Sequence, residues 1–94
     1  MKKAKGLDEL REEIDILDRR IISLLEERFE VIREVSDWKK KMGIEIEDLS
    51  REQEILKKIE DFLKESGSEK RIYLERIYKV IFEESKEYQK KLRE

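Results

Sequence analysis

The sequence predicts an all-α fold, and three observations support that prediction. Apolar residues recur every three or four positions along most of the chain, which is the spacing of one helix face. No segment shows the apolar and polar alternation of a strand, and the 94 residues include no proline and three glycines. A chain of this length with 37% hydrophobic residues fits one small domain, residues 1–94.

Three helices are expected, in the order long, short and medium, over about residues 7–42, 49–65 and 69–92. Gly43 is the expected C-terminal stop of the first helix. Asp48 or Ser50 can cap the second helix. The stretch "ESGSE" breaks the pattern, and Ser66 or Ser68 can cap the third helix. The apolar side of the second helix includes Ile55, Leu56, Ile59, Phe62 and Leu63.

The first helix is too long for the rest of the chain to cover. At about 1.5 Å per residue it measures roughly 54 Å, against roughly 25 Å for the second helix and 36 Å for the third. An amphipathic helix with an uncovered apolar face needs a partner, and a second copy of the same chain is the simplest source. A homodimer is therefore expected.

The composition excludes several classes of function. The 23 basic and 25 acidic residues nearly cancel, so no net field favours nucleic acid or an anionic membrane surface. With no cysteine and no histidine, thiol chemistry, imidazole catalysis and the usual zinc sites are excluded. No cofactor or metal is expected, although carboxylates alone could hold magnesium.

The expected location is the cytoplasm. No apolar run is long enough to span a bilayer, and "MKKAKG" leads into a charged helix and not into the apolar core of a signal peptide.

Polar residues stand at positions where the helical spacing calls for core. They are Arg28, Lys39, Arg51, Glu52, Ser85 and Gln89. A single such residue is usually a snorkelling side chain or a satisfied polar group in the core. Together, the cations could also set the register of a coiled coil or form a buried salt bridge with Glu52. Three cations with few buried anions nevertheless leave positive charge for a ligand to neutralise.

The spacing of the cations on the first helix favours a small anionic ligand. Arg28 and Lys39 differ by only about 20° around the helix axis and are roughly 16 Å apart along it. Arg11 lies roughly 25 Å from Arg28, so the two cannot meet on one chain. If two first helices pair antiparallel near residue 22, Arg11 of one chain becomes level with the interval between Arg28 and Lys39 of the other.

These residues resemble the all-helical class of chorismate mutases over nearly the whole chain. The resemblance is carried by an arginine in "LREEID", another in "LLEERF", a lysine four before a glycine, "DLSRE", and a serine and glutamine spaced by four. It implies an intertwined, domain-swapped helical homodimer of three-helix chains, with active sites that draw residues from both subunits. It also implies a [3,3] rearrangement of chorismate to prephenate, which needs no nucleophile, metal or proton transfer.

The resemblance also implies a role for each polar residue. Arg28, with Arg11 from the partner chain, binds the two substrate carboxylates. Lys39 and Gln89 donate hydrogen bonds to the ether oxygen, and Glu52 accepts one from the ring hydroxyl. The remaining expected substrate-binding residues are Asp48 near that hydroxyl, Ser85 at a carboxylate and Arg51 in the charged wall. A helix cap and a supporting ion pair explain Asp48 and Arg51 almost as well.

Two other functions remain open. Isochorismate–pyruvate lyase shares this fold and a similar anion clamp, and a non-catalytic helical dimerisation module would show similar charged helices. Because the chain ends soon after Gln89, no fused catalytic or regulatory domain is expected. Allosteric control would then need a separate partner protein.

Overall fold

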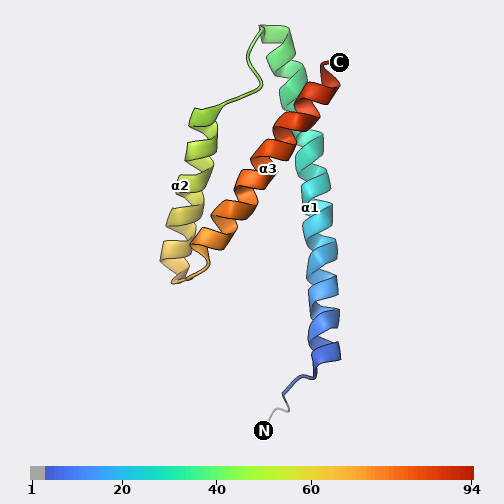
Figure 1. The fold of residues 1–94 in the computed structure, drawn as a ribbon, viewed down its shortest axis with the longest axis vertical. Coiled ribbons are helices and arrows are strands. Elements are labelled where there is room, and N and C mark those ends of the chain that lie inside the picture. Colours follow the sequence, from blue (N-terminus) through green and yellow to red (C-terminus); the bar gives the residue numbers. More distant parts are fainter. Residues whose placement is uncertain (1–3) are drawn as a thin grey trace. The chain divides into compact units, whose positions relative to one another are not determined.

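The computed structural model describes residues 4–94, and every regular element in that range is a helix. The three helices are α1 (Leu7–Met42), α2 (Leu49–Ser66) and α3 (Arg71–Leu92) (Figure 1). The predicted all-α, three-helix chain is confirmed. The chain divides into two compact units, one ending at Val31 and the other spanning Ile32–Glu94, and each is described by itself below. The expectation for "MKKAKG" falls partly on residues 1–3, outside the described residues.

Glycines end the first two helices in the same way. Gly43 has φ +67° and Gly67 has φ +68°, both in the left-handed region that glycine adopts without steric cost. After α1, the Gly43 N–H donates to the Lys40 carbonyl and the Ile44 N–H to the Lys39 carbonyl. This pair of bonds is the Schellman pattern, which satisfies carbonyls that the helix leaves unpaired.

The helix starts agree only in part with the expected caps. Asp48 caps α2, because its Oδ1 accepts a hydrogen bond from the Arg51 N–H at 3.0 Å. The prediction that Ser66 or Ser68 caps α3 is wrong: Ser66 is the last residue of α2, and α3 begins at Arg71 with no side-chain cap. The Ser68 hydroxyl instead accepts from the Lys70 N–H within the turn, which uses the serine before the helix starts.

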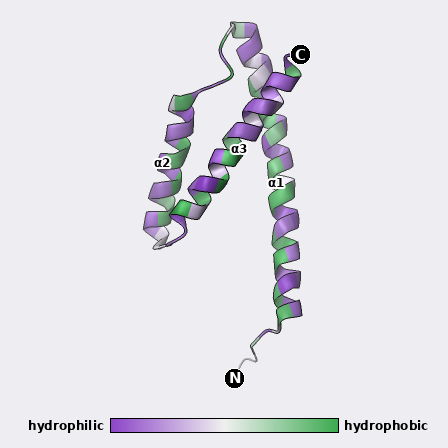
Figure 2. Cartoon of the chain, viewed as in Figure 1, coloured by the Kyte–Doolittle hydropathy of each residue, from purple (hydrophilic) through white to green (hydrophobic). Residues whose placement is uncertain are grey.

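The first unit consists mainly of the N-terminal part of α1, and its large apolar side chains are exposed. Figure 2 shows apolar and polar residues alternating along this part of the helix. The exposed apolar residues are Leu7, Leu10, Ile14, Ile16, Leu17, Ile21, Ile22, Leu24 and Val31. So many exposed apolar side chains on one helix need a partner to remove them from water.

In the second unit, α2 and α3 run antiparallel around the turn at Gly67 and pack against each other (Figure 1). The buried apolar side chains are Leu63 from α2 and Phe82 from α3, and Phe82 makes an edge-to-face contact with Tyr78. Phe62, expected on the same side of α2 as Leu63, is instead 70% exposed. Phe62 precedes Leu63 by one position, about 100° around the helix, so the two cannot both point at α3.

Candidate active site

Two polar side chains on α3 are buried where the apolar spacing calls for core. Ser85 and Gln89, one helical turn apart, are each 4% exposed. The Ser85 hydroxyl donates to the Ile81 carbonyl at 2.7 Å. The Gln89 Oε1 is buried without a hydrogen-bond partner among the described residues. A buried acceptor left unpaired costs about 1–3 kcal/mol, so an amide at this position calls for a functional explanation.

Lys39 lies in the last turn of α1 and is half-buried in the second unit. Its ammonium donates to the Ile46 carbonyl at 2.8 Å. Arg93, which directly follows α3, donates from its guanidinium to the Ile44 carbonyl at 2.9 Å. Lys39 of α1 and Arg93 after α3 therefore both donate to backbone carbonyls of the connection between α1 and α2.

Glu52 forms an ion pair with Lys86, a residue that the sequence analysis did not single out. The Lys86 Nζ lies 3.3 Å from the Glu52 carboxylate, 3.3 Å from that of Glu47 and 2.8 Å from that of Glu83. A hydrogen bond to Glu83 raises the pKa of Lys86 above its ordinary value; burial opposes this, and Glu47 and Glu52 add to it. The salt-bridge alternative for Glu52 named the cations Arg28, Lys39 and Arg51, whereas the cation that pairs with Glu52 is Lys86 of α3.

The sequence carries only a weak signal for Lys86. Lys86 directly follows Ser85 and precedes Gln89 by three positions, so it borders the inward side of α3. Lysines are usually solvent-exposed, and the run of charges around it gives no reason to single it out. Only its partners, which come from the loop, α2 and α3, distinguish it from its neighbours.

Asp48 and Arg51 make contacts with neighbouring residues of the chain, and these contacts would account for both residues without a ligand. The Asp48 carboxylate caps α2 through the Arg51 N–H. The Arg51 guanidinium pairs with Glu54 at 3.1 Å, and both side chains are more than half exposed. Exposed pairs of this kind contribute little stability, so the Arg51 side chain can exchange this partner at low cost.

Arg11 and Arg28 lie in the first unit. Arg11 is exposed, whereas Arg28 is half-buried and takes part in interactions. They are 17 positions apart on α1, which is roughly 25 Å along the axis at 1.5 Å per residue. The helix therefore does not bring the two guanidinium groups of one chain together.

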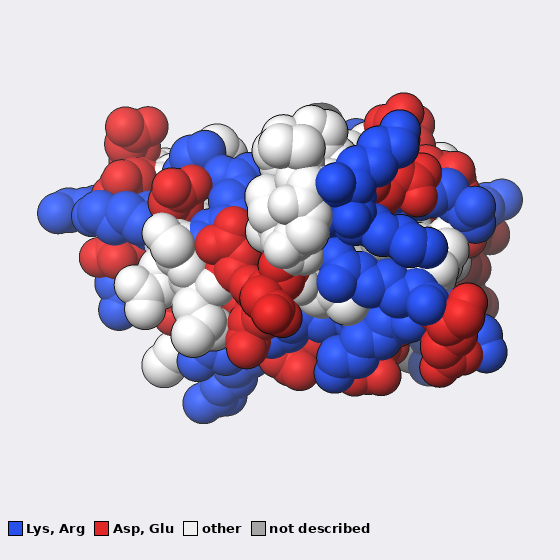
Figure 3. All heavy atoms as spheres, turned by 90° about the horizontal axis from the view of Figure 1, so that it is seen from above, with Lys and Arg blue, Asp and Glu red and all other residues white. Residues whose placement is uncertain are grey.

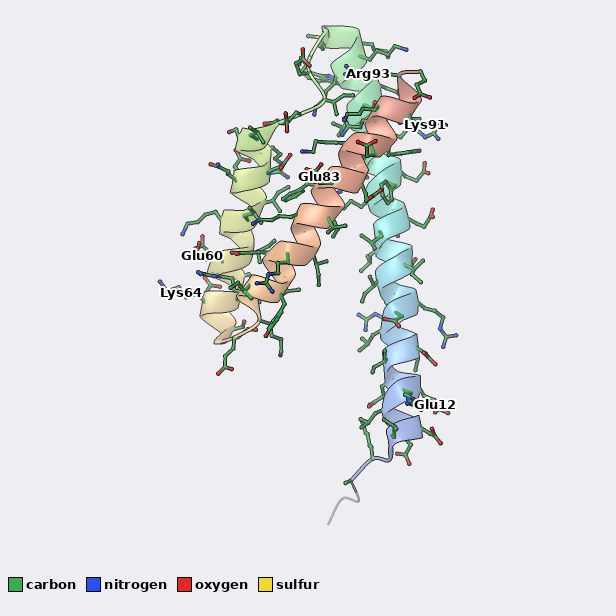
Figure 4. All side chains as sticks on the ribbon, viewed as in Figure 1. Glu12, Glu60, Lys64, Glu83, Lys91 and Arg93 are labelled. Atoms are coloured by element: carbon green, nitrogen blue, oxygen red, sulfur yellow. The ribbon has the colours of Figure 1, made fainter. Side chains whose placement is uncertain are left out.

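A hollow of about 330 Å³ lies beside Lys86, between the residues before α2 and the C-terminal half of α3. Its charged lining is evenly divided: Glu45, Glu47 and Glu83 face Lys86, Lys90 and Arg93. In Figure 4, Glu83 lies midway along α3 and Arg93 directly after its end. Figure 3 likewise shows basic and acidic side chains interspersed over the face in view. Any selection of an anion must therefore depend on local groups and not on a broad field.

The second unit supplies hydrogen-bond donors and a carboxylate held by a cation. Such a set can bind and orient a polar ligand and stabilise developing negative charge. Within residues 4–94, no group of three Asp or Glu side chains lies close enough together to hold a metal ion. None of the helices in those residues combines the length and apolar content needed to cross a membrane.

Comparisons with known proteins identify relatives of the chain. Residues 10–90 match the family model described as chorismate mutase type II. The chain is 33% identical over 84 residues to a chorismate mutase from Methanocaldococcus jannaschii, covering 89% of this chain and 84% of that protein. It is 34% identical over 82 residues to a bifunctional chorismate mutase/prephenate dehydratase from Buchnera aphidicola, covering 87% of this chain and 21% of that protein. No solved structure matches the chain.

Proposed function

This chain belongs to the chorismate mutase type II family, and we propose that it is an isomerase that rearranges chorismate to prephenate. The family match over residues 10–90 is the observation that carries this proposal. The reaction is intramolecular, so the protein has to hold a flexible dianion in its compact form and stabilise charge on the ether oxygen. A chain without histidine or cysteine is suited to that task.

Lys39 and Gln89 are the proposed donors to the ether oxygen. The Lys39 ammonium is half-buried, and its bond to the Ile46 carbonyl fixes its direction. Gln89 is buried on α3, and the Nε2 group of its amide is the proposed donor, because the Oε1 atom can only accept a hydrogen bond. Donors that are oriented before the substrate arrives need no reorganisation as negative charge develops.

The remaining polar residues are proposed to bind the substrate. Glu52 accepts the hydrogen bond of the ring hydroxyl, with Asp48 nearby, and Ser85 contacts a carboxylate. Arg28 of one chain and Arg11 of its partner bind the two carboxylates through bidentate hydrogen bonds. Arg51 is proposed as a further cation that lines the substrate site. The motif positions support these roles: each residue stands where the family resemblance calls for it.

We further propose that the chain acts as a domain-swapped homodimer with shared active sites. The exposed apolar residues of the first unit support this, because a second copy of the same helix would remove them from water. The distance along α1 between Arg11 and Arg28 gives independent support. Light scattering at several protein concentrations should give twice the chain mass of 11.5 kDa.

The activity is tested by following the loss of chorismate absorbance with purified protein, with prephenate identified as the product. Isochorismate, assayed in parallel, separates the mutase from the related lyase, which would release pyruvate. A chain that dimerises but consumes neither substrate would be a non-catalytic module. The cytoplasmic location remains a prediction, which cell fractionation would check.

A further inference from the structure

Lys86 is the most heavily paired cation in the second unit. It is 13% exposed and lies within 3.3 Å of three carboxylates, those of Glu47, Glu52 and Glu83. Glu47 precedes α2, Glu52 is in its first turn, and Glu83 and Lys86 are on α3. One ammonium group therefore links the loop, α2 and α3 at the point where Glu52 is held.

The three carboxylates do not depend equally on Lys86. The side chains of Glu47 and Glu83 are 60% and 68% exposed, so water can solvate their charge. The Glu52 side chain is only 21% exposed, and its ionised form loses much more hydration. Burial thus makes Glu52 the partner for which the lysine matters most.

The charge of the Glu52 carboxylate also matters for binding the proposed substrate. Chorismate carries two negative charges, and an uncompensated carboxylate among its binding residues would repel it. Pairing with a cation lets Glu52 accept a hydrogen bond without adding net negative charge to the site. The pairing also fixes the direction of the carboxylate, because Lys86 holds one oxygen at 3.3 Å.

We infer that Lys86 is a positioning residue of the active site, which orients the Glu52 carboxylate and neutralises its charge toward the dianionic substrate. This inference rests on the proposed function. Lys86 touches no reacting atom and acts only through Glu52. The loop contact to Glu47 is secondary, because that carboxylate is largely in water.

The inference predicts a particular kinetic defect. Lys86→Met keeps an unbranched side chain one atom shorter and removes its charge, so Glu52 becomes an unpaired carboxylate that repels bound chorismate. We expect kcat/KM to fall at least about tenfold, mainly through a higher KM, because the repulsion acts on ground state and transition state alike. Lys86→Arg, which keeps the charge, should recover most of the loss.

A double-mutant cycle with Glu52→Gln tests whether Lys86 acts through Glu52. The neutral amide needs no counter-charge, so adding Lys86→Met to Glu52→Gln should change kcat/KM by less than about twofold. Equal losses in the two backgrounds would overturn the inference and make Lys86 an anchor of the loop. Lys57→Met is the matched control, because Lys57 is an exposed lysine of α2 paired with Asp61; it should retain wild-type kinetics.

The folded state of each variant is checked by circular dichroism and urea unfolding. If Lys86→Met does not fold, Lys86→Gln goes through the same cycle with the same criteria. Failure of the proposed function has a separate signature, namely a folded wild-type protein that does not convert chorismate. An active wild type with equal losses in both backgrounds overturns only the role of Lys86.

Discussion

Mixing two inactive variants tests the proposed sharing of active sites between chains. The perturbation is a pair of substitutions, Arg11→Ala in one chain and Arg28→Ala in the other. The two arginines are separated by 17 positions of one continuous helix, roughly 25 Å, and a guanidinium group reaches only a fraction of that distance. If both contact one substrate, they must come from different chains.

The expected recovery follows from the symmetry of a dimer. Equal amounts of the two chains, unfolded together and refolded, should give dimers of which about half are mixed. Each mixed dimer has one site with both arginines and one with neither. Activity should therefore recover to about one quarter of that of refolded wild type. Each variant alone should keep only the low activity of sites that lack one of the two arginines.

The assay is the initial rate of chorismate loss, with the mixed dimers counted by native mass spectrometry of chains that carry different tags. Arg19→Ala is a control, since Arg19 is an exposed arginine of the same helix that bonds the Asp15 carbonyl; it should remain active alone. No recovery in a sample that contains mixed dimers would refute the shared site. At least one of the two arginines would then have no contact with the substrate.

Four further changes test individual features. Gln89→Glu should abolish most activity at neutral pH, where a carboxylate has no proton to donate. It should regain activity on acidification as that carboxyl protonates, and burial raises the carboxyl's pKa. Profiles of kcat/KM against pH that run parallel to wild type would remove Gln89 from the mechanism. Phe82→Ala should cost about 3–5 kcal/mol of unfolding free energy, because Phe82 is only 5% exposed. Urea denaturation measures this cost, and a value below about 1 kcal/mol would contradict the place of Phe82 in the core. Gly67→Ala should cost about 1–2 kcal/mol of unfolding free energy. The cost comes from the left-handed φ alone, because an added Cβ meets open space. An unchanged urea midpoint would contradict the left-handed conformation of this residue. The difference in unfolding free energy between wild type and Lys86→Met should stay constant from neutral pH up to about pH 10. The pKa of Lys86 is raised in the folded state, so the stability that its charge contributes is lost only as pH rises through this raised pKa. A difference that already declines at about pH 8 would contradict this reasoning.

The sequence alone predicted the three helices and most of the candidate residues. The spacing of apolar residues fixed α1 at residues 7–42, and Gly43 supplied the stop, because local backbone sterics decide where a helix ends. Ser85 and Gln89 could be recognised as inward-facing because helical periodicity depends only on position in the chain. The same periodicity could not tell that neither serine beside Gly67 caps α3: the Ser66 hydroxyl donates to the Leu63 carbonyl, and the Ser68 hydroxyl accepts from the Lys70 N–H within the turn.

Only the tertiary structure decided the charge partners. Glu52 and Lys86 are 34 positions apart, and nothing in either local pattern links a carboxylate on α2 to one particular lysine on α3. Their pairing depends on how the α2–α3 hairpin aligns around its turn, which is set by the packing of Leu63 and Phe82. Ion pairs between helices follow from that packing, because charge attraction is long-ranged and unspecific while close contact between apolar side chains fixes a single alignment.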